Sequence, residues 1–478
     1  MKTKKESRTK IVCTLGPACA SSGLLGEMVR NGMDVARLNF SHGTHAEHLA
    51  NLGRVRAVAR KYGEPVSVIL DLQGPKIRIG HLPSSPVELV AGGRVVITTG
   101  SGPGKGTVLP TTYRHLPRDV RRGDRVLIDD GRIELTVISV KGKDVTLRVD
   151  TGGPVGANKG INLPGISVSA PSLTEKDRSD LLFAFEHDID YVALSFVRKA
   201  HDVAHLRDFI IENGPKGKKI PIIAKIEKDE AIENFDAILK ETDAVMVARG
   251  DLGVELPTED VPLLQKMIVR KCNEAGKPVI IATQMLESMV HAPTPTRAEA
   301  SDVANAVLDG ADAVMLSGET SIGQYPVKAV EMMRRIIDKT EAHVTANVPF
   351  NPDAIPSTHP YDPLSRAACI LADQLKASAI VVLTHSGTTA FHVAKFRPPS
   401  RIIAVTDREK ILRRLNLVWG IRGLIVEELK KDTDVAFRQI QGDLLKQGLV
   451  SKGDTVVMVA GIPLFEGHPT NTIKVDTV

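Results

Sequence analysis

The chain has 478 residues, which at about 150 residues per domain is enough for roughly three domains. Its 62 basic and 57 acidic residues leave a net charge of only +5, and 1 Trp, 5 Tyr and 11 Phe provide few aromatic rings, so nucleic-acid binding is not indicated. No run of ~18 apolar residues exists, which excludes a membrane-spanning helix. The charged N-terminus lacks the apolar region of a secretory signal, and four Cys without a Cys-x-x-Cys spacing indicate a reducing cytoplasm.

Short apolar runs alternate with helix-length amphipathic segments outside a break that begins after Asp71. Eight runs occur, at residues 10–14, 34–41, 66–71, 191–196, 221–227, 244–251, 278–284 and 313–319. Helices are expected after most of them, at residues 22–31, 44–61, 199–213, 228–240, 259–275, 297–309 and 325–341. Strands that alternate with helices pair in parallel, so eight units predict a (β/α)₈ TIM barrel.

The break between the third and fourth runs has no helical period and contains short alternating strands and turn signals. It predicts an all-β domain at residues 73–171, inserted between barrel parts 1–72 and 172–345. The basic stretch 114–125 is interrupted by Asp119 and Asp124, and we expect it to be a solvated hairpin face.

A Pro- and Thr-rich linker at 342–360 leads to a third domain, which we assign to residues 346–478. Strands expected at 379–384, 402–406, 455–460 and 473–475 alternate with helices near 362–376, 388–396, 408–416 and 433–447. This pattern predicts an open α/β layer. The chain ends just after the last of these strands, so we expect no appended C-terminal domain.

Polar side chains end six of the eight expected barrel strands. In this fold the active-site groups come from the C-terminal ends of several strands. Surface polarity at a loop start could explain one such strand but is a poor explanation for six. The candidates are Arg37, Asn39, Ser41, Asp71, Lys225, Glu227, Arg249, Asp251, Thr283, Ser317 and Glu319.

Two carboxylates and two cations among these candidates suggest one reaction. Glu227 and Asp251 supply hard oxygen ligands suited to Mg²⁺ or Mn²⁺. Arg37 and Lys225 can neutralise a phosphoryl group during its transfer. Phosphoryl transfer needs little beyond a metal ion, cations and in-line positioning, so the set favours a phosphotransferase.

The segments that carry these residues resemble the signature segments of the pyruvate kinase family, in the same order and spacing. They are residues 10–17 (KIVCTLGP), 36–43 (ARLNFSHG), 158–165 (NKGINLPG), 221–231 (PIIAKIEKDEA), 248–255 (ARGDLGVE) and 282–289 (ATQMLESM). The resemblance implies transfer of the phosphoryl group of phosphoenolpyruvate to ADP, giving pyruvate and ATP. It also implies a lid role for the inserted domain, a homotetramer and allosteric control.

The resemblance further implies a role for each matching residue. Lys225 would stabilise the phosphoryl group in the transition state, and Arg37 would grip the same phosphate. Glu227 and Asp251 would hold the divalent metal. The substrate carboxylate would be held by the backbone N–H groups of Arg249, Gly250 and Asp251 and by the Thr283 hydroxyl. The nucleotide phosphates would be bound by Asn39, Arg78 and Lys159. The proton for the enolate would come through a relay of Thr283, Ser317 and Glu319.

The third strand departs from the pattern of K⁺-dependent relatives, since Lys76 stands where those enzymes carry Glu. A tethered ammonium can supply the positive charge that a bound K⁺ supplies beside the phosphates, so we expect activity without K⁺. The alternative is that Lys76 is a surface lysine at a domain hinge. The residues of the monovalent-cation site implied by the resemblance are Asn39, Ser41, Asp71 and Leu72.

The segment 383–389 (LTHSGTT) follows an expected strand and precedes an expected helix. A plain helix N-cap by Ser386 or Thr388 is one interpretation. The resemblance favours an allosteric phosphate site, with Thr384, Ser386, Thr388 and Thr389 binding a phosphorylated effector.

Two other classes of protein remain as alternatives. A barrel lyase acting on pyruvate enolates would also use Glu227 and Asp251, but it would not need Lys225 or an inserted lid. A non-catalytic metabolite sensor would be expected to have lost Lys225, Glu227 or Asp251, and all three are present.

Overall fold

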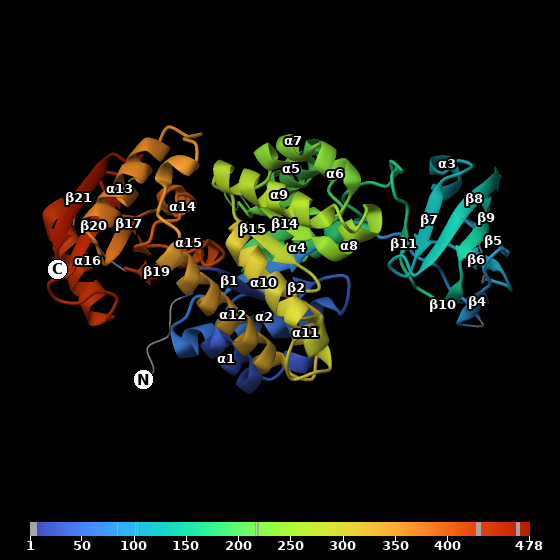
Figure 1. The fold of residues 1–478 in the computed structure, drawn as a ribbon, viewed down its shortest axis with the longest axis horizontal. Coiled ribbons are helices and arrows are strands. Elements are labelled where there is room, and N and C mark those ends of the chain that lie inside the picture. Colours follow the sequence, from blue (N-terminus) through green and yellow to red (C-terminus); the bar gives the residue numbers. More distant parts are fainter. Residues whose placement is uncertain are drawn as a thin grey trace.

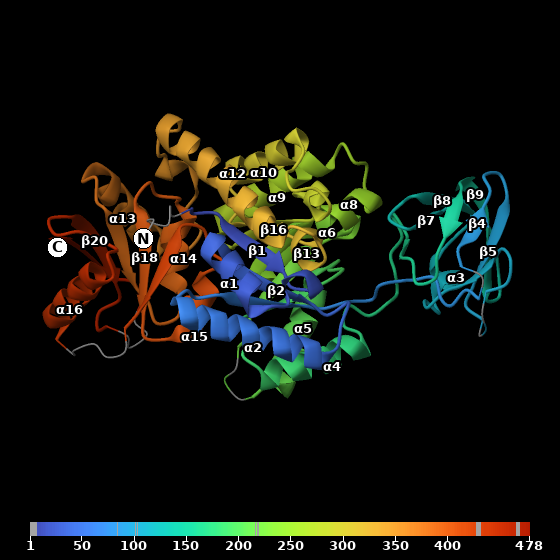
Figure 2. The same cartoon turned by 90° about the horizontal axis from the view of Figure 1, so that it is seen from below.

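The computed structural model describes residues 7–83, 85–100, 102, 104–215, 217, 219–426, 432–464 and 469–478. The barrel lies in the middle of an elongated molecule, with the inserted β domain at one end and the C-terminal α/β domain at the other (Figure 1). Two extended segments join the inserted β domain to the barrel (Figure 2). The predicted fold class is confirmed, because a closed barrel, a further β domain and a C-terminal α/β domain are all present.

Eight parallel strands close the barrel in the order β1-β16-β15-β14-β13-β12-β3-β2. Each falls within an expected apolar run or begins one residue before it. Their bounds are β1 (Lys10–Thr14), β2 (Met33–Asn39), β3 (Ser67–Asp71), β12 (Tyr191–Leu194), β13 (Ile222–Ile226), β14 (Ala244–Ala248), β15 (Val279–Ala282) and β16 (Ala313–Leu316). Fully parallel pairing buries both faces of the strands, which explains why they read as continuous apolar runs.

Helices surround the barrel, at α1 (Ser22–Asn31), α2 (His45–Tyr62), α4 (Glu175–Glu186), α5 (Ala200–Asn213), α6 (Asp229–Glu233), α7 (Phe235–Glu241), α8 (Arg249–Glu255), α9 (Val261–Ala275), α10 (Arg297–Asp309), α11 (Gly318–Ser321) and α12 (Pro326–Asn347). The expected helix at 228–240 is two helices, which meet at Asn234. Helix α4 was not expected, although a capping box of Thr174 and Asp177 marks its start. Within the described residues, no helix is long and apolar enough to cross a membrane.

The inserted β domain holds a six-stranded sheet, β11-β7-β8-β9-β5-β6, and a two-stranded sheet, β10-β4. The bounds are β4 (Val87–Leu89), β5 (Arg94–Thr98), β6 (Val108–Pro110), β7 (Arg125–Ile128), β8 (Ile133–Lys141), β9 (Asp144–Thr151), β10 (Gly153–Val155) and β11 (Ile161–Asn162). The hairpin expected at 114–125 is wrong, because the short helix α3 (Leu116–Asp119) lies there. Pro117 sits in the first turn of α3, where the missing N–H costs nothing.

The C-terminal domain has a five-stranded sheet in the order β19-β18-β17-β20-β21. Its strands are β17 (Ala379–Leu383), β18 (Arg401–Thr406), β19 (Ile421–Ile425), β20 (Thr455–Ala460) and β21 (Thr472–Thr477), and its helices are α13 (Asp362–Gln374), α14 (Thr388–Lys395), α15 (Glu409–Leu415) and α16 (Thr433–Lys446). The four expected strands and four expected helices are present. Strand β19 was missed because Arg422 and Gly423 interrupt its apolar pattern.

Helix α15 and the turn after it dock onto the N-terminal end of the barrel, opposite the strand ends that carry the candidate site. Leu417 is fully buried and belongs to the same core cluster as barrel-interior residues such as Val12 and Ile223. The hydroxyl of Tyr191, at the start of β12, donates to the backbone oxygen of Arg414 at 2.9 Å. The C-terminal domain therefore covers the N-terminal end of the barrel. Burial of the Leu417 side chain contributes about 2 kcal/mol to the free energy of unfolding.

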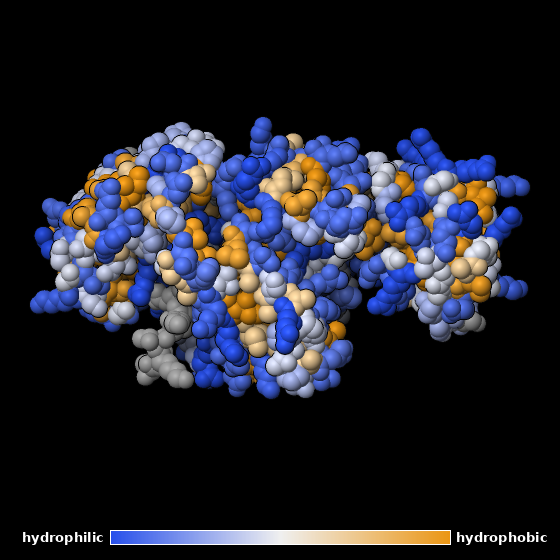
Figure 3. Space-filling view, viewed as in Figure 1, coloured by the Kyte–Doolittle hydropathy of each residue, from blue (hydrophilic) through white to orange (hydrophobic). Residues whose placement is uncertain are grey.

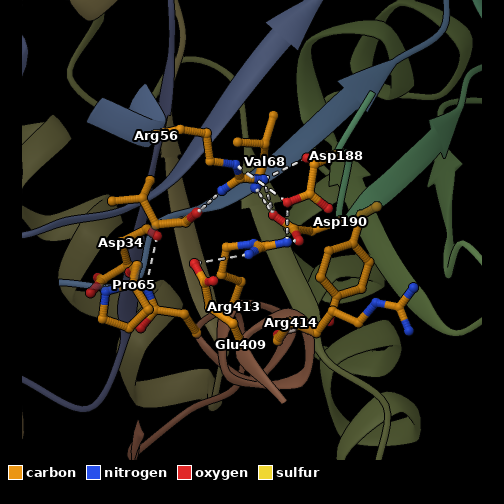
Figure 4. Close-up of polar contacts among 12 residues, drawn as sticks. Asp34, Arg56, Pro65, Val68, Asp188, Asp190, Glu409, Arg413 and Arg414 are labelled. Carbon is orange, nitrogen blue, oxygen red and sulfur yellow. Dashed lines mark hydrogen bonds and ion pairs between the residues drawn. The ribbon is translucent and has the colours of Figure 1, made fainter. Parts of the chain in front are cut away.

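A buried ion-pair network strengthens this junction (Figure 4). Asp190 is fully buried; its Oδ1 accepts from Arg413 Nε at 2.9 Å and its Oδ2 from Arg56 Nη2 at 2.8 Å. Arg413 also pairs with Asp188, which lies in the same barrel loop, and with Glu409 in its own helix. One barrel carboxylate is thus held between an arginine of the barrel and an arginine of the C-terminal domain.

Replacement of Arg413 by Ala is expected to loosen this junction. The change leaves the buried Asp190 carboxylate with one cation instead of two, at a cost of about 3 kcal/mol in the free energy of unfolding. Scanning calorimetry should show a clearly lower transition temperature. The matched control is Arg408→Ala, an exposed arginine at the start of the same helix; equal transition temperatures for the two variants would contradict the assigned role.

Candidate active site

The Lys225 side chain lies at the C-terminal end of the barrel, against three acceptors from three strands or the loops that follow them. Its ammonium Nζ is 2.7 Å from Ser195 Oγ and 2.9 Å from Glu227 Oε1. The same nitrogen is 3.3 Å from Asp71 Oδ1, and the side chain is only 11% exposed. An ammonium has three N–H donors, and three acceptors of the chain surround this one, so the direction of each N–H is fixed by the protein.

Arg37 shares Asp71 with Lys225. The guanidinium Nε lies 2.6 Å from Asp71 Oδ2, and its Nη1 lies 2.9 Å from the Thr14 hydroxyl. Asp71 is 1% exposed, and its two carboxylate oxygens face two cations, Oδ2 facing Arg37 and Oδ1 facing Lys225. Sequence reasoning predicted Arg37, Asp71, Lys225 and Glu227 as one constellation, and the structure brings them together.

The charged groups of this cluster stabilise one another in their ionised forms. Burial by itself lowers the pKa of the Lys225 ammonium, but the Asp71 and Glu227 charges outweigh it and the pKa lies above its ordinary value. Burial likewise acts to raise the pKa of Asp71, but Lys225 and Arg37 hold it below its ordinary value. At neutral pH the site therefore presents a charged ammonium and a charged guanidinium on an ionised carboxylate.

Ser195 and Phe196, just after β12, complete this cluster and were missed from sequence. Ser195 Oγ accepts from Lys225 and donates to the backbone oxygen of Leu72 at 2.7 Å. Phe196 has a positive φ of 55°, and its N–H donates to Glu227 Oε2 at 2.6 Å. For Ser195 the only signal in the sequence was a hydroxyl at a strand end, which is weak. For Phe196 there was none, because the strained backbone that directs its N–H leaves no pattern in the sequence.

Glu227 and Asp251 are the residues suited to a divalent cation. Burial raises the pKa of the Glu227 carboxyl, the Lys225 charge opposes that shift, and the Asp251 carboxylate nearby adds to it. Among the described residues, no group of three or more His, Cys, Asp or Glu side chains could hold a metal ion. Two carboxylates fit the way Mg²⁺ is bound, with water and substrate oxygens as the other ligands.

The strand ends of β14 and β15 meet at Thr283. Gly250 N–H donates to Thr283 Oγ1 at 2.8 Å, and Thr283 adopts a positive φ of 68°. A β-branched residue rarely takes that backbone conformation, so the surrounding contacts must hold it there. Arg249 is fixed by Asp302 in α10 through two contacts of 2.6 and 2.7 Å, and by the Thr283 backbone oxygen at 2.9 Å. Asp302 was not among the predicted residues.

Ser317 and Glu319 lie beyond the end of β16. The Glu319 carboxylate is 1% exposed and accepts from Leu286 N–H at 3.0 Å and Ser317 N–H at 2.7 Å. The Ser317 hydroxyl is buried, and within the described part of the chain it has no hydrogen-bond partner.

The three predicted nucleotide residues occupy two domains. Asn39 ends β2, and its side-chain oxygen accepts from Ser41 N–H at 3.1 Å. Arg78 and Lys159 lie at the two segments that lead into and out of the inserted β domain. Arg78 Nη1 donates to the backbone oxygen of Asn158 at 3.0 Å, and Lys159 pairs with Asp129 at 2.7 Å.

Lys76 is half-buried and lines a pocket together with Phe196 and Asp251. The charges of Arg78, Lys76 and Arg37 add to burial in lowering the pKa of His42, so all three cations are close to that imidazole. The Lys76 ammonium forms no hydrogen bond or ion pair with any residue that the structure describes, whereas Arg37 is paired with Asp71. Leu72 is 1% exposed, and its backbone N–H donates to Ala193.

The loop 384–389 connects β17 to α14 in the C-terminal domain. Thr384 Oγ1 accepts from Gly387 N–H at 2.9 Å, and the hydroxyls of Ser386 and Thr388 lie 2.9 Å apart on the surface. The N-cap residue of α14 is Gly387, so the plain N-cap interpretation of Ser386 or Thr388 is wrong. Thr389 Oγ1 lies 2.8 Å from the hydroxyl of Thr470.

Two family models match the chain. The model described as "Pyruvate kinase, barrel domain" matches residues 6–330, and the model described as "Pyruvate kinase, alpha/beta domain" matches residues 362–476. Together they cover both parts of the barrel, the inserted β domain and the C-terminal sheet.

Characterised relatives match over almost the whole chain. A pyruvate kinase of Mycobacterium tuberculosis is 48% identical over 98% of this chain and 98% of its own length. One of Corynebacterium glutamicum is 46% identical, with coverages of 98% and 97%. A crystal structure of a Cryptosporidium parvum pyruvate kinase superposes with a TM-score of 0.91 at 37% identity, covering 98% of this chain and 96% of the other. The chain therefore belongs to the pyruvate kinase family of phosphotransferases.

Proposed function

We propose that this chain transfers the phosphoryl group of phosphoenolpyruvate to ADP, giving pyruvate and ATP in glycolysis. The observation that carries the proposal is the buried Lys225 ammonium, which three acceptors direct to one point at the C-terminal end of the barrel. A fixed cation stabilises charge that develops on a transferring phosphoryl group without reorganising during the reaction. Arg37, which lies in β2 and shares Asp71 with Lys225, would hold the same phosphoryl group.

The metal assigned to this site is Mg²⁺ or Mn²⁺, held by Glu227 and Asp251. When bound, such an ion neutralises negative charge on the substrate oxygens. The Phe196 N–H hydrogen bond keeps Glu227 oriented, and a carboxylate oxygen still has a lone pair for a second partner.

The product enolate has to receive a proton, and we assign this step to the Thr283 side of the site. The backbone N–H groups of residues 249–251 and the Thr283 hydroxyl would hold the substrate carboxylate. The Ser317 hydroxyl, which is buried and lacks a partner among the described residues, is suited to relay a proton next to Glu319.

We infer that the inserted β domain, residues 73–171, acts as a lid over the barrel parts 1–72 and 172–345. Its two connecting segments carry Arg78 and Lys159, which would bind nucleotide phosphates together with Asn39 of the barrel. Closure of such a domain excludes water and so prevents hydrolysis of the phosphoryl group.

All four cysteines are buried and unpaired, which supports the proposal of a reducing cytoplasmic location.

Lys225→Ala should lower the turnover number at least ~1,000-fold with the fold unchanged, because the fixed cation is lost from the transition state. Pyruvate formation from phosphoenolpyruvate is followed with and without ADP. The control is Lys240→Ala, an exposed lysine of α7, which should retain full turnover. A mild loss in the Lys225 variant would refute its role, and pyruvate formed without ADP would point to a lyase instead.

We further propose that the Lys76 ammonium takes the place of a monovalent cation. Its position near Arg37 and Arg78 and its lack of a partner among the described side chains support this role. A positive charge at that place would also repel K⁺ from the site formed by Asn39, Ser41, Asp71 and Leu72.

Exchange of KCl for tetramethylammonium chloride should therefore change wild-type activity by less than about twofold. Lys76→Gln removes the tethered charge and should lower activity in K⁺-free buffer, with partial recovery on addition of KCl. Lys76→Arg keeps the charge and serves as the control. A large stimulation of the wild-type enzyme by KCl would sink the proposal.

For the C-terminal domain, residues 346–478, we propose an allosteric phosphate site at Thr384, Ser386, Thr388 and Thr389, in a homotetramer. The exposed hydroxyls of Ser386 and Thr388 lie at the start of α14, where backbone N–H groups favour an anion. Coupling between such a site and catalysis fits the symmetry of a tetramer.

Combined replacement of Ser386, Thr388 and Thr389 by Ala should abolish activation by sugar phosphates or AMP, since the phosphate loses its hydroxyl donors. Maximal turnover should be unchanged, because the loop is remote from Lys225. Initial rates are measured at low phosphoenolpyruvate over a range of effector concentration, with Ser451→Ala, an exposed hydroxyl of the same domain, as the control. Activation that survives in the triple variant would show that the site is wrong.

A further inference from the structure

A groove on the inserted β domain is separate from the candidate active site. It has a volume of about 940 Å³ and is formed by the end of β5, the segment from β6 to α3, and the turn between β8 and β9. Its side chains include Thr99, Thr112, Arg114, Arg118 and Lys143. This size is that of a small-molecule pocket.

The groove is strongly basic. Arg114, Arg118 and Lys143 line it together with His115, and no acidic residue does. All four basic side chains are exposed, and none makes a hydrogen bond or ion pair with any residue in the described ranges. Cations of one sign gathered in a concave surface raise the local concentration of anions.

The acidic residues nearest in sequence are engaged elsewhere. Asp144 accepts a hydrogen bond from Thr98 Oγ1 at 2.6 Å, and Asp119 is held by Tyr113 and by Ser169 N–H at 2.9 Å. Neither one lines the groove. Both carboxylates thus have other hydrogen-bond partners, although the Arg118 charge still contributes to lowering the pKa of Asp119.

Other cations of the same domain are neutralised by carboxylates. Arg125 pairs with Glu134 at 2.7 Å, and Arg148 pairs with Asp150 at 2.7 Å. The exposed Arg121 and Arg122 of this domain also make no ion pair with a described residue, so what distinguishes the groove is that its cations gather around one concave surface. Figure 3 shows hydrophilic side chains along the upper edge of the inserted domain, where Figure 1 places α3.

We propose that this groove binds a small polyanion with two or more phosphate or carboxylate groups. Arg114, Arg118 and Lys143 place three positive charges around one concave surface. Such an arrangement suits a ligand with several negative groups better than a ligand with a single negative group. The neighbouring Tyr113 is 8% exposed and does not line the groove, so the aromatic ring that the groove presents is the imidazole of His115. The Thr99 and Thr112 hydroxyls donate to the backbone oxygens of Lys143 and Arg78, so recognition of the anion falls to the basic side chains.

The groove adjoins the segment that carries Arg78. Thr112 N–H donates to the Arg78 backbone oxygen at 3.0 Å, and Arg78 N–H donates to Thr112 Oγ1 at 3.2 Å. The Arg78 side chain reaches instead to Asn158. The proposed anion site therefore lies next to the segment that carries Arg78, and it goes beyond the proposed phosphotransfer.

Calorimetric titration of the full chain with inorganic pyrophosphate, in low salt and without divalent metal, tests this site. Arg114→Gln/Arg118→Gln should weaken one saturable binding event about tenfold or more. The matched control, Arg121→Gln/Arg122→Gln, removes the same charge from exposed arginines of the same domain that do not line the groove, and should change affinity less than about twofold. Any pyrophosphate bound at the candidate active site should contribute equally in the wild type and in the two double variants.

Equal weakening in both double variants would reduce the effect to general charge and overturn the proposal, as would an unchanged affinity in the groove variant. Tighter binding of hexaglutamate than of pyrophosphate would overturn the small-ligand assignment in favour of an acidic protein segment. Phosphotransfer activity without added polyanion should be the same in all proteins. Lys143→Gln is the second variant should the double variant fail to fold, and it should also weaken binding.

Discussion

The site depends on keeping one nearly buried ammonium charged, that of Lys225, whose side chain is 11% exposed. Removing a cation from water is costly, and Lys225 remains charged only because Asp71 and Glu227 face it. The same carboxylates have to be held in turn, Asp71 by Arg37 and Glu227 by the Phe196 N–H. The members come from the ends of four strands, β2, β3, β12 and β13, with Lys225 and Glu227 both from β13. A closed barrel permits the cluster because it brings strand ends that are distant in sequence to within hydrogen-bond distance.

This requirement explains the strained backbone found around the site. Phe196 and Thr283 have positive φ angles of 55° and 68°, conformations that non-glycine residues avoid. Both place a polar group, an N–H toward Glu227 and a hydroxyl toward Gly250, where ordinary strand geometry would not. Packing of the barrel around them supplies the free energy that holds these two residues.

Sequence patterns were sufficient for the fold class and for most of the charged cluster, since buried parallel strands appear as apolar runs and the charged side chains follow them. Ser195, Phe196 and Asp302 escaped prediction for a common reason. Their roles arise from backbone direction or from a contact between elements far apart in the chain, as in the Arg249–Asp302 pair. Strand β19 was missed because its partner β18 stabilises a segment whose own composition is poor for a strand.

The closure of the barrel by Leu417 has a consequence for synthesis. Strand β1 pairs with β16, about 300 residues later, and the barrel core is complete only when Leu417 is in place. The six-stranded sheet of the inserted β domain, in contrast, draws all its strands from residues 94–162. On the ribosome, the inserted β domain is therefore able to fold long before the barrel around it is closed. The eight strands are complete at Leu316, but the barrel-interior core lacks Leu417 until that part of the C-terminal domain has emerged.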